Sequence, residues 1–270
     1  MISIVQSVYS NNKQFKNSLL TCFSSIESLN IPFQYIIFND KGDKDIINFI
    51  PQRILNHPNF KYHYSDVNYG LNGAPGGMVG GAKLVKYKYV HQINEDDFYT
   101  PSFYSLSIKH LESLDNSYAG ICSNCYHVDE EFEITKIAFP LQGEGINKAW
   151  SNPTIMFHSI FNPKNKKLIT TNNFLYNPGT IFKSELYKKI GLPDIESYGG
   201  CVDFEYWTRC IFNGFKFKYL SLPTWSYMKS SSSLSTLANN SSEDLRKTVY
   251  NPRILETYQK MWENNNYKLK

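Results

Sequence analysis

The sequence predicts an α/β protein of a single domain, with a mostly parallel central sheet and helices on both faces. Short apolar, β-branched runs alternate along the chain with segments whose apolar residues recur at helical spacing. This alternation is typical of parallel strands joined by helices that cover the sheet. The chain has 270 residues, of which 41% are hydrophobic and 16% aromatic, so one large core can form without disulfides or metals.

The first half of the chain carries the alternation most clearly. Residues 2–9 form the first expected strand, and a Ser-Asn-Asn turn leads into a helix over residues 13–29. Residues 70–81 are rich in glycine and are expected to form a flexible loop, since they match neither phosphate-binding glycine motif. The other expected elements are a strand over 33–38, a helix over 45–50, a strand over 60–64, a helix over 82–89 and a strand over 90–93.

The second half repeats the pattern less regularly. Residues 129–173 are polar and weakly periodic, which suits long loops over a site better than a second domain. The other expected elements are helices over 102–114, 184–190, 203–212 and 243–262, and strands over 119–128, 179–182 and 216–220.

Charge and hydropathy exclude several classes of partner. The 28 basic and 24 acidic residues give a net charge of +4, and no run of lysine or arginine is long enough to track a nucleic-acid backbone. No stretch approaches the roughly 20 apolar residues that a membrane-spanning helix needs, and the N-terminus lacks the features of a signal peptide. We expect a cytoplasmic protein, for which peripheral membrane contact stays open.

The five cysteines are an odd number and fit reduced thiols better than a disulfide framework. Cys122 and Cys125 are spaced as CxxC, and Cys201 and Cys210 could complete four sulfur ligands for zinc. However, the second pair has the wrong spacing for a zinc knuckle, and the first lies in an expected strand. We therefore favour free thiols.

Polar residues follow two of the expected strands. Asn39 and Asp40 come after residues 33–38, and Asn94-Glu95-Asp96-Asp97 comes after residues 90–93. The carboxyl ends of parallel strands meet at one edge of a sheet, where open α/β sheets bind their ligands. We expect the site at this edge. The alternatives are an Asx turn at Asp40 before Gly42, and a solvated turn at residues 94–97.

Five segments carry motifs in a recognisable order. They are Ser7-Val8-Tyr9, Asn39-Asp40-Lys41-Gly42, Asn68-Tyr69-Gly70, Ile93-Asn94-Glu95-Asp96-Asp97 and Val202-Asp203-Phe204-Glu205-Tyr206-Trp207-Thr208-Arg209. This ordered set resembles family 2 of the glycosyltransferases, which are inverting enzymes with the GT-A fold. Two positions depart from the family pattern, because Asn94 stands where an aspartate is usual and Val202 stands where a glutamate is usual.

The resemblance implies a GT-A fold with a Rossmann-like sheet over residues 1–240, followed by a C-terminal helix over 241–270. Within that domain, residues 1–98 would bind the nucleotide sugar and residues 99–240 would bind the acceptor. The implied reaction moves a sugar from a nucleotide-diphosphate donor, UDP-linked or similar, to a hydroxyl of a glycan or a lipid-linked acceptor. Polysaccharide biosynthesis would be the setting.

The resemblance also assigns roles to residues. Asp96 would hold Mn²⁺ or Mg²⁺, which neutralises charge on the departing diphosphate. Asp203 would act as the general base that takes the proton from the acceptor hydroxyl. The residues implied in donor binding are Val8, Tyr9, Asp40, Asn94, Asp96 and Lys229.

Other interpretations of these residues stay open. Asp203 could simply interact with the helix dipole, and Lys229 could be an exposed loop lysine. Glu205 is expected to be a solvated acid, and Trp207 fits either the core or an acceptor wall. At the level of function, the alternatives are a sugar-phosphate nucleotidyltransferase and a non-catalytic module that binds a sugar nucleotide or a glycan. The former normally has a glycine-rich loop with Arg and Lys after the first strand, and residues 10–12 offer none.

Overall fold

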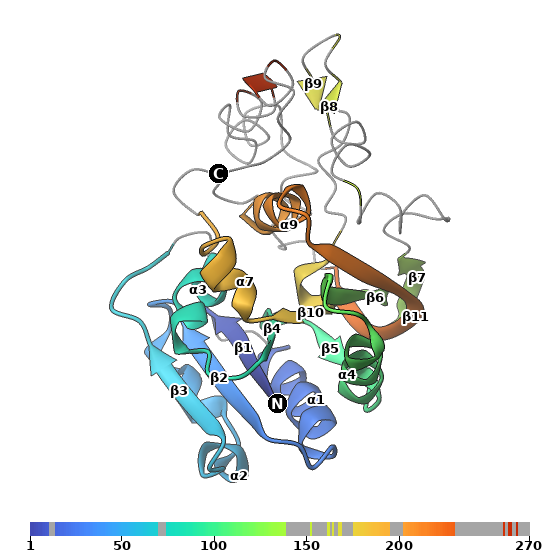
Figure 1. Ribbon diagram of the computed structural model, residues 1–270. Helices are drawn as coiled ribbons and strands as arrows, with labels where there is room; N and C mark the ends of the chain where they lie inside the picture. Colours follow the sequence, from blue (N-terminus) through green and yellow to red (C-terminus); the bar gives the residue numbers. More distant parts are fainter. Residues whose placement is uncertain are drawn as a thin grey trace.

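The computed structural model describes residues 1–10, 14–69, 74–138, 152, 161–162, 164, 167–168, 175–194, 202–229, 256, 259–260 and 263. Within these residues, one nine-stranded sheet forms the centre of the molecule (Figure 1). Its strands are β1 (Ile2–Val8), β2 (Phe33–Asn39), β3 (Phe60–Tyr64), β4 (Tyr89–Ile93), β5 (Phe98–Tyr99), β6 (Tyr118–Val128), β7 (Ile134–Ala138), β10 (Thr180–Lys183) and β11 (Lys216–Met228). A separate pair, β8 (Phe161–Asn162) and β9 (Lys167–Leu168), is antiparallel.

The order of strands across the sheet is β3-β2-β1-β4-β10-β6-β11-β5, with β7 paired to β6. The first four are parallel neighbours. β10 is antiparallel to both β4 and β6, so β6 runs in the direction of β4, and β11 is parallel to β6. The carboxyl ends of β1, β2, β4 and β6 therefore point to the same edge. The expected mostly parallel sheet is confirmed, with β10 as an antiparallel insertion and with β5 and β7 antiparallel to their neighbours β11 and β6.

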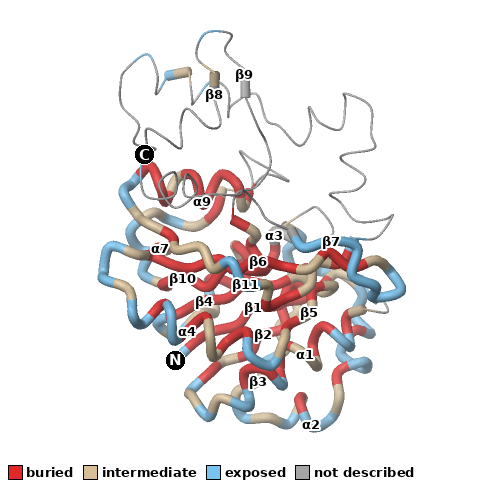
Figure 2. Tube along the Cα trace, turned by 90° about the vertical axis from the view of Figure 1, so that its right-hand side faces the viewer, coloured by how far each residue is buried: buried red, intermediate tan, exposed pale blue. Residues whose placement is uncertain are grey.

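Helices cover both faces, as the sequence predicts (Figure 1). They are α1 (Phe15–Glu27), α2 (Gln52–Leu55), α3 (Ala74–Val79), α4 (Phe103–Ser113), α7 (Glu185–Lys189) and α9 (Val202–Phe212), with 3-10 helices η1 (Lys44–Phe49), η3 (Gly81–Leu84) and η4 (Asn177–Gly179). Alternate residues of each strand point to opposite faces. Ile4 packs with α1, α2 and α4, whereas Val5 packs on the face of α3 and η3, and Val90 packs with α7 and α9. Strands β1, β2, β4, β6 and β10 are mostly buried between these layers (Figure 2).

The described part of the glycine-rich segment is helical, where we expected a flexible loop. α3 occupies residues 74–79, while the helix expected over 82–89 is limited to η3 before the chain enters β4. The Gly77 N–H donates to Ser7 Oγ at 2.8 Å. A Cβ atom on Gly76 would lie 2.5 Å from the Asp40 Cγ, and one on Gly77 would lie 1.9 Å from the Ser7 Oγ. Glycine is required because the α3 backbone lies directly on the edge of the sheet.

Several other elements differ from expectation. The expected helix over 45–50 is the 3-10 helix η1, and the strand expected over 216–220 continues to Met228. β7 begins the region expected to form loops, most of which lies outside the described residues. The helix expected over 243–262 also lies outside them, except at 256 and 259–260. None of the described helices is long and apolar enough to cross a membrane.

Candidate functional site at the ends of β1, β2 and β4

The ends of three parallel strands bring the predicted site segments to one edge. Val8 is level with Asn39 across β1 and β2, and Gln6 is level with Ile93 across β1 and β4. The Asp40 N–H donates to the carbonyl oxygen of Val8 at 3.0 Å. Val8, Tyr9, Asp40 and residues 94–97 therefore lie at neighbouring strand ends, as the sequence predicts.

The turn after β2 is closed by Asn39 rather than by Asp40. The Asn39 Oδ1 accepts from the Gly42 N–H at 2.8 Å, and its Nδ2 donates to the Asp43 carbonyl at 2.7 Å. A Cβ atom on Gly42 would lie 1.8 Å from the Tyr9 carbonyl oxygen, so only glycine allows this close approach. The Asx-turn interpretation of Asp40 is therefore wrong.

Asp40 instead holds the segment that precedes α3. Its two carboxylate oxygens accept from the Tyr69 backbone N–H at 3.0 and 3.2 Å. The residue is buried, and burial raises the pKa of its carboxyl from 3.8 to about 6, although the Tyr69 hydrogen bond opposes the shift. Asp40 is thus a mostly ionised, poorly solvated acceptor near pH 7.

The turn after β4 carries three consecutive carboxyl groups, of which Asp96 and Asp97 are the two aspartates. Asp96 is partly exposed, whereas Asp97 is buried. The Asn94 Nδ2 donates to the Asp97 Oδ2 at 3.2 Å, while the Asp97 Oδ1 has no hydrogen-bond partner among the described residues. Burial raises the pKa of Asp96 to about 6, and burial with the nearby Asp96 charge raises that of Asp97 well above its usual value. A simple solvated turn does not fit these buried acids.

Glu95 belongs to the site, although the sequence analysis assigned it no role. Its Oε2 accepts from the backbone N–H of Tyr9 at 2.9 Å and of Ser10 at 3.4 Å, and its Oε1 accepts from the Ser10 Oγ at 3.0 Å. Burial raises the pKa of Glu95 to about 7 despite these bonds. Glu95 thus joins the end of β1 to the end of β4. It fills the unspecified position of the acidic motif, so no sequence signal could have identified it.

A network of buried polar side chains holds the backbone at the start of the acidic turn. The Asn94 carbonyl accepts from the Gln6 Nε2 at 3.2 Å and from the Ser18 Oγ at 3.4 Å. The Gln6 Nε2 also donates to Ser18 Oγ, and the Tyr35 hydroxyl donates to the Gln6 Oε1 at 2.8 Å. Side chains from β1, β2 and α1 therefore determine where the turn begins.

Asp203 lies in a different layer, at the start of α9. Its Oδ1 accepts from the Phe204 N–H at 2.7 Å. α9 packs beside α7 on the face that also carries α3, since the Gln92 Nε2 donates both to the Gly77 carbonyl of α3 and to the Tyr187 hydroxyl of α7. The role of Asp203 as a base stays a prediction.

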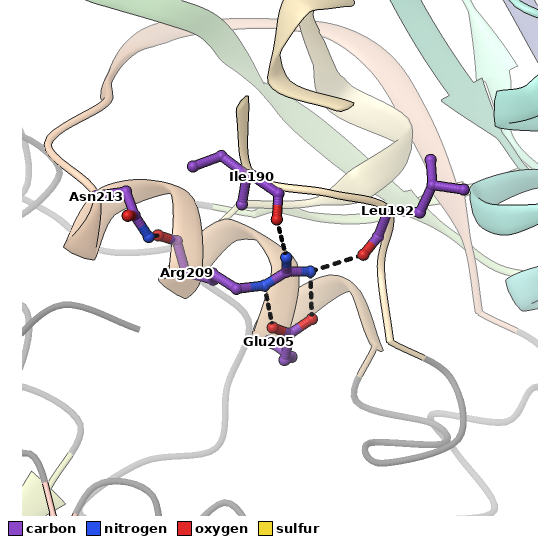
Figure 3. A network of polar contacts seen from close by, with 5 residues as sticks. All are labelled: Ile190, Leu192, Glu205, Arg209 and Asn213. Atoms are coloured by element: carbon purple, nitrogen blue, oxygen red, sulfur yellow. Dashed lines mark hydrogen bonds and ion pairs between the residues drawn. The ribbon is translucent and has the colours of Figure 1, made fainter. Parts of the chain in front are cut away.

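The other motif residues of α9 are structural. Glu205 is only 6% exposed and forms a two-point ion pair with Arg209, so its interpretation as a solvated acid is wrong. The guanidinium also donates to the carbonyls of Ile190 and Leu192, which ties α9 to the segment after α7 (Figure 3). Trp207 is 2% exposed and packs in the core.

Lys229 is exposed directly after β11, and its backbone N–H donates to the Val128 carbonyl at 2.8 Å. Its charge acts on the far part of β6, where it lowers the pKa of His127. Its assignment to the diphosphate stays a prediction.

Among the described residues, the acidic turn offers oxygen ligands for a metal ion. Within the described part of the chain, no group of three or more His, Cys, Asp or Glu side chains could hold a metal ion. Cys122 and Cys125 are buried in clusters on opposite faces of β6, so this pair cannot chelate zinc; Cys201 lies outside the described residues. Asp96 and the unpartnered Asp97 Oδ1 fit a hard divalent cation that takes its remaining ligands from substrate phosphates.

Comparisons with known proteins identify the fold. No protein-family model matches the sequence, and no curated protein matches it either. The structure is similar to TarS of S. aureus, residues 1–349, in complex with UDP-GlcNAc, with a TM-score of 0.61 and 14% identity over 95% of this chain and 66% of that one. The fold is GT-A-like.

A second solved structure supports the same fold. The mannosyltransferase PcManGT from Pyrobaculum calidifontis, in complex with GDP-Man and Mn²⁺, matches with a TM-score of 0.58 and 11% identity over 98% of this chain and 72% of that chain. The present chain covers 60% of the TarS chain in another crystal structure of TarS 1–349.

Proposed function

We propose that this protein is a glycosyltransferase that binds a nucleotide-diphosphate sugar at the ends of β1, β2 and β4. It would transfer the sugar, with inversion, to a hydroxyl of a glycan or a lipid-linked acceptor. The observation that carries the proposal is the pair Asp96 and Asp97, with a buried carboxylate oxygen that has no partner among the described residues. This pair lies in a fold shared with proteins crystallised with UDP-GlcNAc and GDP-Man.

The donor would bind across the three strand ends. Val8, Tyr9 and Asp40 would hold the nucleoside, with the Asp40 carboxylate accepting from an N–H at the edge of the base. Asn94 would contact the ribose, because an amide can both donate to and accept from a hydroxyl. Asp40 supports this role because it is a buried acceptor whose carboxylate, among the described residues, accepts from a backbone N–H.

Asp96, assisted by Asp97, would hold Mn²⁺ or Mg²⁺. The cation supplies charge neutralisation for the departing diphosphate when it is bound. The protein contributes a prepared turn, since Gln6 and Ser18 hold the Asn94 carbonyl and Glu95 holds the end of β1. A turn fixed in advance needs little reorganisation as charge develops on the leaving group.

Asp203 would take the proton from the acceptor hydroxyl as that oxygen attacks the sugar. Its position at the start of α9 and its hydrogen bond from Phe204, which orients the carboxylate, support this assignment. The ion pair of Glu205 and Arg209 would hold α9 in place without contact with substrate.

A donor screen tests the proposal. Hydrolysis and transfer of UDP- and GDP-sugars would be measured with Mn²⁺ or Mg²⁺ for the wild type, Asp96→Ala and Asp203→Asn. We expect Asp96→Ala to lose turnover of the donor, and Asp203→Asn to lose transfer while it keeps donor affinity. Asp45→Asn, at an exposed position of η1, is the control and should match the wild type. Transfer by Asp203→Asn at the wild-type rate would exclude Asp203 as the base.

A further inference from the structure

His127, near the end of β6, is a buried side chain without a polar partner. The residue is 4% exposed, and neither ring nitrogen makes a hydrogen bond within the described part of the chain. Leaving a buried polar group unpaired is energetically unfavourable, and such groups in native proteins are rare. A ligand that accepts a hydrogen bond from the ring would remove this cost.

Two lysines lie on the same face as the His127 ring. Lys136 of β7 is directly opposite His127, and Tyr227 of β11 is level with it on the other side, with ring centroids 5.5 Å apart. Lys229 directly follows β11, two residues beyond Tyr227, and its backbone N–H continues the pairing with β6 at the Val128 carbonyl, so the strand alternation places it on the same face as Tyr227. Both lysine side chains are exposed.

The electrostatic field at the ring is positive. Burial, together with the charges of Lys229 and Lys136, lowers the pKa of His127 to about 4, and no carboxylate of the described residues opposes this shift. In the turn between β6 and β7, the Asp129 carboxylate accepts from the backbone N–H groups of Glu131 and Glu133 and so bonds within its own turn. His127 is therefore a neutral hydrogen-bond donor between two cations.

His127 and the two lysines lie near the turn of residues 94–97. Cys125 lies two residues before His127 on the same face of β6. The charge of Asp97 raises the pKa of the Cys125 thiol, while the charges of Lys136 and Lys229 lower it. The two lysines and the buried carboxyl thus flank one stretch of β6.

We propose that His127, Lys136 and Lys229 form an anion site that binds a phosphate group. A phosphate offers several acceptor oxygens, enough for two ammonium groups and one imidazole N–H. The site itself stands on the described geometry, but the source of the phosphate rests on the proposed function. It is either the diphosphate of the donor or a phosphate group on the acceptor.

The test follows the His127 ring by NMR in the ¹⁵N-labelled full chain, with inorganic phosphate as the probe and His127→Gln to assign the signals. We expect a saturable shift of the His127 ring signals. His63, which has Lys61 beside it on β3, is the internal control and should not shift. Lys136→Ala should weaken phosphate binding by about tenfold, because a charge-assisted hydrogen bond is lost. The matched exposed-strand variant Lys61→Ala should leave it unchanged.

Either of two results would overturn the proposal: no shift of the His127 signals, or equal phosphate affinity in Lys136→Ala and the wild type. UDP with Mn²⁺ then identifies the source. Displacement of phosphate from His127 by UDP supports the site and assigns it to the donor diphosphate, whereas simultaneous binding supports the site and assigns it to an acceptor phosphate. If phosphate shifts His127 but no nucleoside diphosphate binds, the anion site stands and the proposed function fails.

Discussion

The Glu95 carboxylate accepts the backbone N–H of Tyr9 at 2.9 Å, and this bond joins the loop after β1 to the turn after β4. In the proposed function, Tyr9 belongs to the nucleoside end of the donor site and the neighbour of Glu95, Asp96, belongs to the cation end. The Glu95 side chain thus helps to set the spacing between the two ends. A donor that spans both ends depends on this spacing, because groups that are out of position bind it less well.

Replacing Glu95 should weaken donor binding without removing any group that contacts the donor. We expect Glu95→Ala to lower the affinity for UDP or GDP with Mn²⁺ by about tenfold and the free energy of unfolding by about 1–3 kcal/mol, because backbone N–H groups lose their acceptor. Glu95→Gln keeps one acceptor oxygen and should show a smaller loss of affinity. Calorimetry and urea unfolding give the two values.

The matched control for Glu95 is Asp115, whose carboxylate also accepts from a backbone N–H and a hydroxyl, both of Ser117. Asp115→Ala should leave nucleotide affinity unchanged. Wild-type affinity in Glu95→Ala would show that this bond does not position the site.

Alanine at Gly77 should destabilise the protein although alanine favours helices. In an isolated helix the substitution stabilises by about 1 kcal/mol, but here the new methyl group would lie 1.9 Å from the Ser7 Oγ. We expect a loss of about 1–3 kcal/mol from overpacking. In the double variant with Ser7→Ala, the nearest atoms would be the Cβ of residue 7 and Val5 Cγ1, at 3.2 and 3.4 Å. The double variant should therefore lose less than the sum of the single variants in urea unfolding; strict additivity would contradict the close contact.

The ion pair of Glu205 and Arg209 should matter far more for stability than an exposed pair of the same spacing. Their side chains are 5% and 11% exposed, so removal of one partner leaves a buried charge unpaired. We expect Arg209→Ala to lower the free energy of unfolding by about 3 kcal/mol or more.

The exposed pair Glu185–Lys189 is the control for Arg209, with the same i,i+4 spacing and side chains that are 46% and 52% exposed. Lys189→Ala should change the free energy of unfolding by less than about 0.5 kcal/mol. Equal effects of Arg209→Ala and Lys189→Ala would show that the buried pair does not hold α9.

His91 should make the protein less stable in acid. Its Nε2–H donates to the Pro178 carbonyl at 2.7 Å, so its Nδ1 accepts from the Tyr104 hydroxyl at 2.8 Å. Burial lowers the pKa of His91 from 6.5 to about 3. The unfolded chain therefore binds more protons between these values, and stability falls as the pH falls through 6.5 towards 3.

The measurement for His91 is the difference in free energy of unfolding between the wild type and His91→Gln. We expect this difference to shrink by about 1.5 kcal/mol between pH 6.5 and 5. The comparison is needed because Asp40 and Glu95, whose pKa values are raised, contribute with the opposite sign over the same range. A difference that is independent of pH would contradict the assignment of His91 as a buried neutral ring.

The local sequence pattern was enough to predict most strands and the edge of the sheet where the site lies. β3 matches its expected limits of 60–64, because aromatic residues between turns identify a strand. Parallel strands share one edge, so Asp40 and Asp96 could be placed together without a structure. The insertion of β10 between β4 and β6 could not be predicted from the sequence, because strand order depends on long-range pairing.

The features that the sequence did not predict depend on contacts between residues far apart in the chain. α3 contains Gly76 and Gly77, which disfavour helix formation, and only its contacts with Ser7 and Asp40 explain it. Glu205 and Arg209 belong to a motif associated with catalysis, yet their pairing stabilises α9. Glu95 has no signature, because its partners are backbone N–H groups contributed by a distant loop.

The most direct test of the central claim is the binding of UDP and GDP to the wild type and Asp96→Asn, measured by calorimetry with and without Mn²⁺. The proposed site predicts that at least one nucleotide binds the wild type, that Mn²⁺ strengthens this binding at least tenfold, and that Asp96→Asn loses the Mn²⁺ effect. Absence of binding by both nucleotides, or an equal Mn²⁺ effect in Asp96→Asn, would contradict a nucleotide-diphosphate site at the ends of β1, β2 and β4.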